Sequence, residues 1–286
     1  MSFLDRVRAL PRLGLGLSTE YGAGGTPGAL DPRAVRAENP RWAGFLEIGV
    51  EVEKGLDAPA RAWVADGHPT TWHFLDINLD EPEDFDAAWL AGLRAGVEAV
   101  KPAWLCGDAG MWHFGPRDRG QMLLLPPVLT AASADALARG VARLRAATGK
   151  EVLPENPPGT VYLGDLHLLD FFARVSDAAD TGLLLDVAHL AIYQRATGRT
   201  PLDGLDGFPL DRVVELHVAG GTERDHQGYA WVDDDHSPLP LADTWRILDR
   251  VLPHTPNLKA VVLECERNPL DAVRGTLTRL DGRLPW

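Results

Sequence analysis

Eight short apolar runs, separated by longer segments, restrict the fold of this sequence more than any other feature. They cover residues 13–17, 45–50, 70–75, 102–106, 151–155, 182–187, 213–218 and 259–264. Helical spacing of apolar residues marks four of the intervening segments, at residues 84–100, 132–148, 165–179 and 241–252. Strands that alternate with helices pair in parallel through right-handed crossovers. Eight such units predict an α/β fold of the (β/α)8 TIM-barrel class.

The 286 residues fit one such barrel, which typically takes about 250 residues. We therefore expect one TIM-barrel domain over residues 1–286, with residues 22–32 forming a loop over the first strand. An open doubly wound sheet is the alternative. The segment GLGLSTEYGAGG at residues 14–25 lacks the glycine spacing of a dinucleotide-binding loop, so we expect no such site. The helix at residues 132–148 should begin beside Ser133 as its cap and end at Gly149.

Composition and charge exclude several classes of partner. The hydrophobic fraction of 45% and the charged fraction of 24% are typical of soluble globular proteins. A net charge of −13 argues against nucleic acid or an anionic membrane as a partner, because both select for basic surfaces. The first sixteen residues hold no apolar run of signal-peptide length, so we expect a cytoplasmic protein with reduced thiols. The two cysteines, Cys106 and Cys265, rule out a zinc site of four thiolates.

Polar residues recur at the ends of the predicted strands, where TIM barrels carry their chemistry. Six consecutive strands, the third to the eighth, each end in or lead into a potential metal ligand. The long segment after the seventh strand is expected to be a loop that carries three aspartates and a histidine. The candidates, in chain order, are His73, Asp108, Glu155, Asp186, His189, His217, Asp234, His236 and Glu264. Parallel strands would bring these side chains to one face of the barrel.

Carboxylates and imidazoles without thiolates suit iron, manganese or zinc. So many carboxylates in one barrel mouth would repel one another strongly without cations, or would have to take up protons. The number of donors exceeds what a single ion needs. The residues therefore predict a site for two or three metal ions.

Each candidate also has a plain structural interpretation. His73 could be a hydrogen-bonded core histidine, and Glu155 could form a salt bridge with a barrel arginine. Asp186 and His189 could cap the helix after the sixth strand. Asp233 is best interpreted as part of a solvated acidic loop, and Cys106 as a small buried residue. Surface or supporting positions are expected for the remaining histidines considered, His113, His167, His226 and His254. The metal interpretation rests on the coincidence across six strands.

Five motifs follow one another in the order of a known family. They are LPENPPG, LLLDVAHLAIY, VVELHVAGG, DDDHSPL and VVLECERNP. The chain resembles the multinuclear non-heme iron-dependent oxidative enzymes, which include the methanobactin-biosynthesis oxidase. This resemblance implies a xylose-isomerase-like barrel with two or three iron ions and dioxygen as co-substrate. It also implies modification of cysteine or other side chains of ribosomally made peptides, with a partner protein that presents the precursor.

The resemblance assigns metal ligands to seven of the candidates: His73, Glu155, Asp186, His217, Asp234, His236 and Glu264. Three departures from the family pattern accompany them. Cys106-Gly107-Asp108-Ala109 stands where the family usually has Ser-Glu-His-Leu, so an aspartate takes the place of a histidine. His189 replaces a usual asparagine, and Glu264-Cys265-Glu266 replaces Glu-x-Asp. Asp108 and His189 keep a donor at each changed ligand position and complete the predicted set of nine.

We therefore expect an iron-dependent oxidative enzyme that acts on a peptide or small thiol substrate. Asp108, Glu155 and His217 are its predicted catalytic residues. Substrate contacts are predicted for Tyr21, Asn156, Trp112 and Trp231, with Trp72 as a further residue of the entrance; the four aromatic residues could equally serve only in packing. The alternatives are a divalent-metal sugar isomerase or epimerase, a hydrolase of the endonuclease-IV type, and a barrel that only binds. An isomerase would want a catalytic lysine, which the predicted strand ends lack.

Overall fold

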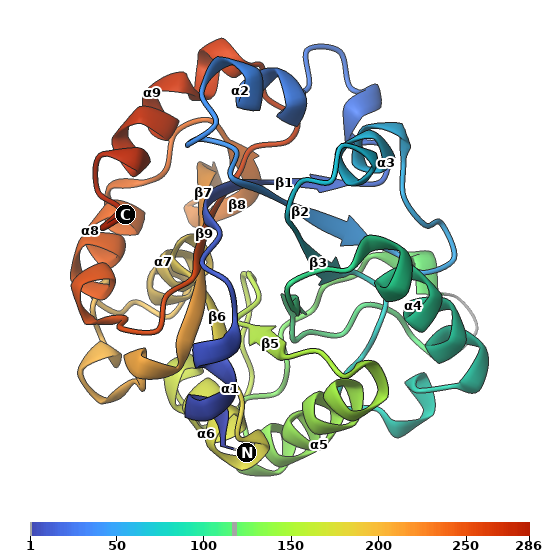
Figure 1. Cartoon of the computed structure of the whole chain (residues 1–286). Helices are drawn as coiled ribbons and strands as arrows, with labels where there is room; N and C mark the ends of the chain where they lie inside the picture. Colours follow the sequence, from blue (N-terminus) through green and yellow to red (C-terminus); the bar gives the residue numbers. More distant parts are fainter. Residues whose placement is uncertain (1, 116–118) are drawn as a thin grey trace.

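Eight parallel strands close into a barrel in the computed structural model, which describes residues 2–115 and 119–286. The strands are β1 (Gly14–Glu20), β2 (Phe45–Val50), β3 (Thr70–Phe74), β4 (Leu105–Asp108), β5 (Val152–Glu155), β6 (Leu183–Asp186), β7 (Val213–His226) and β9 (Ala260–Glu264). Neighbours in sequence pair with one another, β1 also pairs with β9, and β9 with β7 (Figure 1). The pairing of β6 with β7 completes the ring. The predicted TIM barrel is confirmed, and the open sheet is excluded.

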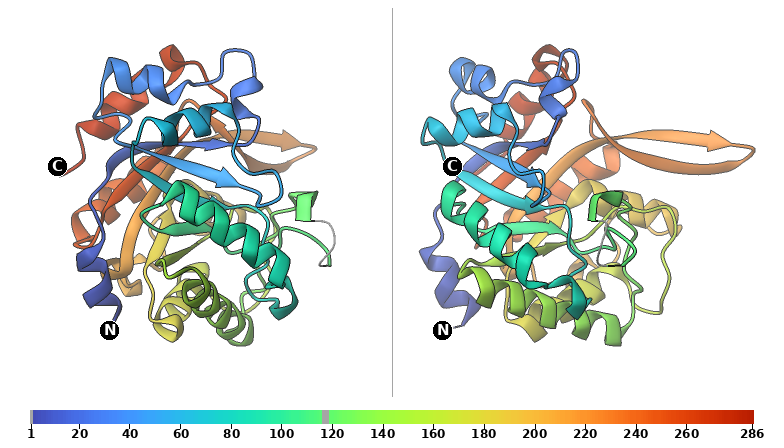
Figure 2. Two further views of the ribbon diagram at one scale, coloured as in Figure 1. Left: turned by 45° about the vertical axis from the view of Figure 1, so that its right-hand side comes forward. Right: turned by 90° about the vertical axis from the view of Figure 1, so that its right-hand side faces the viewer.

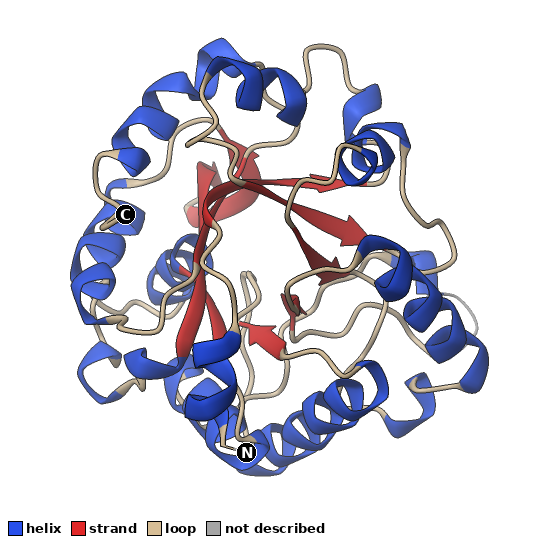
Figure 3. Ribbon diagram, viewed as in Figure 1, coloured by secondary structure: helices blue, strands red, loops and turns tan. Residues whose placement is uncertain are grey.

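Helices surround this ring on its outer side, as the colouring of Figure 3 shows. They are α2 (Pro32–Glu38), α3 (Ala58–Ala65), α4 (Ala87–Val100), α5 (Ala131–Thr148), α6 (Leu168–Ala179), α7 (Val187–Ala196), α8 (Ala242–Val251) and α9 (Leu270–Asp281). Short 3-10 turns lie at Ala23–Gly25, Pro82–Asp84, Arg119–Gln121, Leu205–Gly207, Leu210–Arg212 and Leu252–His254. In the described part of the chain, no helix combines the length and apolarity needed to cross a membrane.

All four predicted helices are confirmed, and capping explains where their ends differ. The helix expected from residue 84 begins at Ala87 because the side chain of Asp86 accepts a hydrogen bond from the backbone N–H of Trp89. Ser133 was the wrong cap for α5. The preceding Thr130 caps this helix by accepting from the backbone N–H of Ser133. Gly149 ends α5 as expected, with a left-handed φ of 68°.

The barrel interior has an apolar layer below a polar layer. Side chains two residues apart on a strand point to the same side, so Leu153 and Glu155 both face inward, as do Leu184 and Asp186. The lower member of each pair packs in a cluster with Phe45, Trp104 and Val262. The upper member lies at the C-terminal end of its strand. The same alternation turns Trp72 outward against α4 while the adjacent His73 faces the barrel axis.

An N-terminal helix that the sequence analysis did not predict, α1 (Phe3–Ala9), seals the lower end of the barrel. Phe3 and Val7 belong to the same buried cluster as the lower interior layer. Arg6 holds the helix in place through two hydrogen bonds to the carboxylate of Glu151, of 2.8 and 3.0 Å. Water is therefore kept from the polar layer on this side.

The loop predicted after the seventh strand is instead a β-hairpin. β7 continues beyond the barrel to His226 and pairs in antiparallel fashion with β8 (Tyr229–Ser237). Gln227 and Gly228 form its turn with positive φ values of 54° and 84°, the geometry that suits the twist of a hairpin. In Figure 2 this hairpin projects from the end of the barrel opposite α1. The charged residues on both strands conceal the strand signal, because both faces of the outer hairpin are exposed to solvent.

The close contact between α5 and the segment after β3 gives a test of the fold. A Cβ at Gly140 would lie 1.7 Å from the carbonyl oxygen of Leu79, whereas a Cβ at Gly275 in α9 would meet nothing within 4 Å. Gly275→Ala should raise the free energy of unfolding by up to about 1 kcal/mol, because alanine is the better helix former. Gly140→Ala should lower it by about 1–3 kcal/mol through overpacking. Urea unfolding followed by tryptophan fluorescence measures both, and a stabilised Gly140→Ala protein would contradict the described packing.

Candidate metal centre

The structure brings the nine predicted ligands together at the C-terminal end of the barrel. They are His73 on β3, Asp108, Glu155 and Asp186 at the ends of β4, β5 and β6, His189 on α7, His217 on β7, Asp234 and His236 on β8, and Glu264 at the end of β9. Each has a nitrogen or oxygen atom within 3.9 Å of another member. Asp234 and His236 are half-buried, and the others are buried. Their role as ligands stays a prediction.

Glu155 lies at the middle of the inner half of this group. Its Oε2 is 2.8 Å from Nε2 of His73, and its Oε1 is 3.2 Å from Nδ1 of His217. Asp108 lies beside it in register on β4, with Oδ2 3.9 Å from Nε2 of His73. Among the described residues, no arginine forms the salt bridge that was considered for Glu155. Its ion pairs are instead with histidines.

Asp186 serves two purposes, so both interpretations offered by the sequence apply to it. One carboxylate oxygen, Oδ1, caps α7 by accepting a hydrogen bond of 2.7 Å from the backbone N–H of His189. The other, Oδ2, points into the group and lies 3.6 Å from Nε2 of His189. The cap fixes the orientation of the carboxylate and places His189 one helical turn away, on the same side. A local helix signal therefore also builds the site.

The hairpin and β9 complete the outer half of the group. Oδ2 of Asp234 lies 3.0 Å from Nε2 of His189 and 3.8 Å from Nε2 of His236. Glu264 lies 3.3 Å from Nδ1 of His217 and 3.8 Å from Nε2 of His236. By contrast, the neighbouring Asp233 points away and pairs with Arg224 at 2.8 Å, as expected for a solvated residue.

Two further carboxylates belong to the site and were missed as members of it. Glu47 on β2 is 1% exposed and lies 3.0 Å from Nε2 of His217. Glu266 lies 3.0 Å from Nδ1 of His236 and also accepts a hydrogen bond from Ser18. A signal for Glu47 was present, since a glutamate inside the apolar run FLEIGV must face a polar interior. It was overlooked because it lies within its strand, short of the end.

Several buried ligand atoms of this group make no hydrogen bond of good geometry, although His217 lies in ion-pair contact with Glu47 and Glu155. These atoms are Oδ1 of Asp108, Oε1 of Glu155, Oδ2 of Asp186, both ring nitrogens of His217, Oδ1 of Asp234 and Oε2 of Glu264. An unpaired buried polar atom costs roughly 1–3 kcal/mol, and more when it is charged. Seven atoms without a well-formed hydrogen bond in one group depart from the usual polar core, in which most buried polar atoms are hydrogen-bonded. Cations bound between them would supply the missing partners, so this donor set fits metal ions.

The burial of so many charges shifts their pKa values in both directions. Burial and the nearby Glu155 raise the pKa of Asp108 well above its usual range, and burial raises the pKa of Asp186 to about 7. Burial opposes the charge on Glu155, but His217 and His73 outweigh it and lower the pKa of this carboxyl. Burial likewise opposes the charged form of His73, yet its hydrogen bond to Glu155 and the charge of Glu47 raise its pKa to about 9. Without metal, protonated imidazoles therefore offset part of the negative charge.

A cavity of about 170 Å3 opens over the group and is lined by Asp108, His189, Asp234, His236 and Glu264, among others. Of the predicted substrate contacts, Trp112 lines this cavity, and its ring N–H donates to the backbone carbonyl of Asp108. The structure places the other three outside the lining of this cavity. Asn156 is buried in hydrogen bonds to the backbone of Asp186, Tyr21 is exposed, and Trp231 lies on the hairpin.

The remaining aromatic and histidine predictions have mixed outcomes. Trp72 was wrongly placed at the entrance, because it packs against Gly96 on the outer side of the barrel. His113 is buried and lies 2.9 Å from Asp84, so it supports the loop that carries Trp112. His167 caps α6, and His254 is an exposed surface residue, as expected.

Solved structures with similar folds confirm the class of barrel. A xylose isomerase-like TIM barrel protein from Mycobacterium smegmatis, solved in complex with magnesium, matches with a TM-score of 0.60 and 12% identity, over 96% of this chain and 97% of that chain. Endonuclease IV from Thermus thermophilus matches with a TM-score of 0.52 and 16% identity, over 94% of this chain and 100% of that one. At these identities, the likeness concerns the fold alone.

Sequence comparison identifies the family. A UPF0276 protein of Rhizobium meliloti is 27% identical over 233 residues, which cover 77% of this chain and 72% of the relative. The family described as RiPP precursor modification enzyme MbnB/TglH/ChrH, where RiPP denotes a ribosomally made and later modified peptide, matches residues 30–275. That range contains the nine predicted ligands and confirms the resemblance drawn from the motifs. The chain belongs to the MbnB/TglH/ChrH family of RiPP precursor modification enzymes.

Proposed function

We propose that this chain is an iron-dependent oxidative enzyme that uses dioxygen to modify a ribosomally made peptide at a site for two or three iron ions. The membership in a family of peptide-modifying enzymes supports the reaction class and the substrate class. The observation that carries the metal proposal is the gathering, at one end of the barrel, of seven buried ligand atoms that make no hydrogen bond of good geometry. The absence of cysteine sulfur from this set favours iron, manganese or zinc over softer ions.

Shared carboxylates support more than one ion. His73, Asp108 and Glu155 have ligand atoms within 4.8 Å of one another, and so do Glu155, Asp186 and His217. Asp186 also joins His189 and Glu264 in a third such group. Because Glu155 and Asp186 each belong to two groups, they are the carboxylates that neighbouring ions would share. They are the proposed bridging ligands.

Asp108, Glu155 and His217 remain the proposed catalytic residues, because each would touch the metal ions. When bound, the iron ions would supply binding of a substrate sulfur and the electrons for reduction of dioxygen. Glu155 and His217 lie deep in the barrel, where the apolar layer and α1 exclude water from below. Asp108 lines the cavity above them and is the one of the three that a substrate would meet. A precursor-presenting partner protein is also proposed, on the basis of the family resemblance.

Metal analysis tests the proposed class directly. Protein expressed anaerobically with iron should contain two or three iron ions per chain, measured by elemental analysis, and Mössbauer spectra should show coupled iron sites. One tightly held zinc or manganese ion would overturn the proposal in favour of the hydrolase or isomerase alternatives. Protein that purifies without metal would instead favour a barrel that only binds.

Two adjacent aspartates on β8 offer a matched test of the ligand assignment. Asp234 faces the metal centre, whereas Asp233 points outward to Arg224. Loss of a residue that only hydrogen-bonds to a metal ligand weakens metal binding roughly 10–100-fold. Asp234→Asn should weaken iron binding by at least this factor, because Asp234 is a proposed ligand itself. Asp233→Asn should leave iron content unchanged. Iron titration of both variants, with circular dichroism as a check on folding, decides the matter, and equal iron content in both would remove Asp234 from the ligand set.

The raised pKa of His73 predicts proton release when metal binds. A metal ligand imidazole must be neutral, and metal-free His73 has a pKa of about 9, so it carries a proton at pH 7. Iron affinity should therefore rise as the pH increases from about 6 to 9. Ferrous titration in weak buffer with a pH indicator measures the release, and His73→Gln should release about one proton fewer. Release that is unchanged in this variant would exclude His73 as a ligand.

A further inference from the structure

Three adjoining cavities form a groove that runs from the metal centre along β8. The innermost, of about 170 Å3, holds the ligands described above. It shares Leu124 and Asp234 with a second cavity of about 430 Å3. The second shares Gly159, Ile192 and Val232 with a third cavity of about 500 Å3 near the tip of the hairpin. We call these three cavities together the β8 groove.

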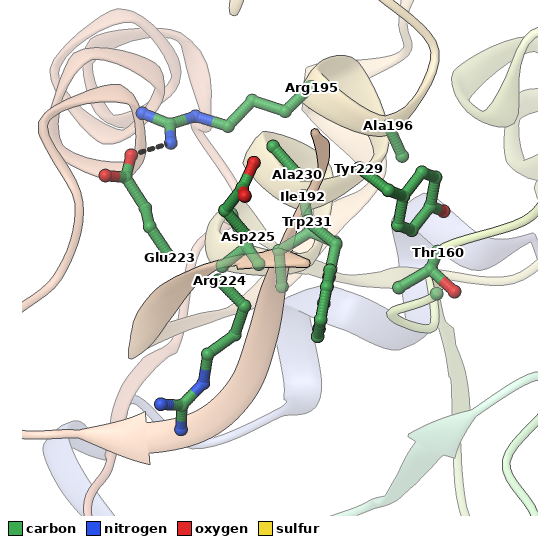
Figure 4. Close-up of a pocket in the computed structure, with 12 residues that line it drawn as sticks. Thr160, Ile192, Arg195, Ala196, Glu223, Arg224, Asp225, Tyr229, Ala230 and Trp231 are labelled. Carbon is green, nitrogen blue, oxygen red and sulfur yellow. Dashed lines mark hydrogen bonds and ion pairs between the residues drawn. The ribbon is translucent and has the colours of Figure 1, made fainter. Parts of the chain in front are cut away.

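The outer end of the β8 groove has an apolar and aromatic character. Tyr229 and Trp231 line the outer cavity with Ile192 (Figure 4) and stack with ring centroids 5.8 Å apart. They lie on the face of β8 that carries Asp233, whose carboxylate accepts a hydrogen bond of 2.6 Å from the Trp231 ring N–H. Three of the four charged side chains that line the outer cavity form ion pairs, and the fourth, Asp225, accepts a hydrogen bond from the backbone N–H of Gly228. Arg195 forms an ion pair with Glu223, drawn in Figure 4, while Arg224 pairs with Asp233. The outer cavity therefore offers ring faces and aliphatic groups, with little net charge.

Exposed apolar side chains gather around the same groove. Among the described residues, ten large hydrophobic side chains are exposed, and seven of them lie on the hairpin or on the loops after β4 and β5. These seven are Phe114, Met122, Leu125, Val128, Val161, Leu163 and Tyr229. Met122, Leu125, Val161 and Tyr229 line the groove itself. Apolar surface concentrated at one mouth of a soluble protein marks a binding site.

The dimensions of the β8 groove favour a chain-like occupant over a small molecule. A small thiol compound would be held by the innermost cavity alone. The outer cavities extend the site along β8 from Asp234 to Tyr229, which are five steps of an extended strand apart, or roughly 17 Å. An extended peptide of about six residues covers this distance.

We propose that the β8 groove binds the segment of the substrate peptide next to the modified residue, in extended conformation, with an apolar side chain in the outer cavity. This inference rests on the proposed function and names the substrate determinant of the same site. The modified side chain lies over the metal ligands. The apolar side chain four or five positions away contacts Tyr229 and Trp231.

Synthetic peptides test this assignment. The probes are fluorescein-labelled peptides of glycine and serine with one cysteine and one leucine or phenylalanine, placed one to five positions from the cysteine on either side. Anisotropy titration with the iron-supplied full-length protein should show tightest binding for a spacing of four or five on one side. Trp231→Ala should weaken that binding roughly tenfold, the effect of one buried aromatic ring, and Trp231→Phe should restore most of it.

A leucine pair serves as the matched control. Leu125 lines the groove, whereas Leu239 is 71% exposed just beyond β8 and lies outside the lining of the three cavities. Leu125→Ala should weaken the best peptide several-fold, and Leu239→Ala should not. Three results would each overturn the groove assignment. Peptide affinity could be independent of the spacing, it could be equal in wild type and Trp231→Ala, or binding could be undetectable for every peptide.

Iron content, measured in the same samples, separates this inference from the proposed function. Trp231 and Leu125 should not alter iron content when replaced, because neither belongs to the ligand group. Normal iron content without spacing-dependent peptide binding would overturn the β8 groove and leave the proposed chemistry intact. Spacing-dependent binding to protein that holds no iron would support the groove and refute the iron site.

Discussion

Burial of carboxylates next to imidazoles is the constraint on which the rest of this structure depends. Removing an ionised carboxylate from water costs several kcal/mol even after the protein relaxes, so such groups are tolerated only with compensating charge. Here Glu155, Asp186 and Glu47 are each at most 1% exposed. The closed barrel, its apolar lower layer and the plug formed by α1 all increase the need for cations at this end. The geometry of the site follows from that need.

The departures from the family pattern become intelligible when their positions in space are compared. Asp108 stands where the family usually has a histidine, and His189 stands where it usually has an asparagine. The two side chains face each other, with Oδ1 of Asp108 3.6 Å from Nδ1 of His189. If the resemblance drawn from the motifs holds at these positions, an imidazole stands at the start of α7 and a carboxylate at the end of β4, so the pair of donors is kept between neighbouring elements.

The hairpin connects the metal centre to the proposed peptide groove. Its strand β8 supplies Asp234 and His236 at one end and the aromatic pair at the other. His236 adopts a left-handed φ of 48°, which is unfavourable for a side chain with a Cβ. Asn268 donates a hydrogen bond to its carbonyl, and Glu266 contacts its ring, so neighbours from the segment after β9 hold it there. Backbone strain held in place by its surroundings is common at functional sites.

Local sequence patterns suffice to predict the barrel and most of the polar residues that gather at its C-terminal end. Apolar runs have a period that depends only on local backbone geometry, and parallel strands must place their C-terminal ends together, so the convergence of His73, Glu155 and His217 could be predicted. Even the double role of Asp186 follows from a local capping rule.

Three other features depend on how segments that are distant in the sequence pack together. Glu47 faces the interior as its local pattern suggests, but its contact with His217, at 3.0 Å, arises only when the closed ring brings β2 near β7. The hairpin forms because β7 continues beyond the barrel and pairs with β8, from the Gly220–Ser237 pair to the His226–Tyr229 pair. The charged residues of both strands resemble those of a loop. The β8 groove exists only where the hairpin, α7 and the loops after β4 and β5 meet. Local sequence encodes the periodicity of apolar residues and the caps of helices. These three features depend instead on which distant segments become neighbours. The neighbours are fixed only when the ring of strands closes.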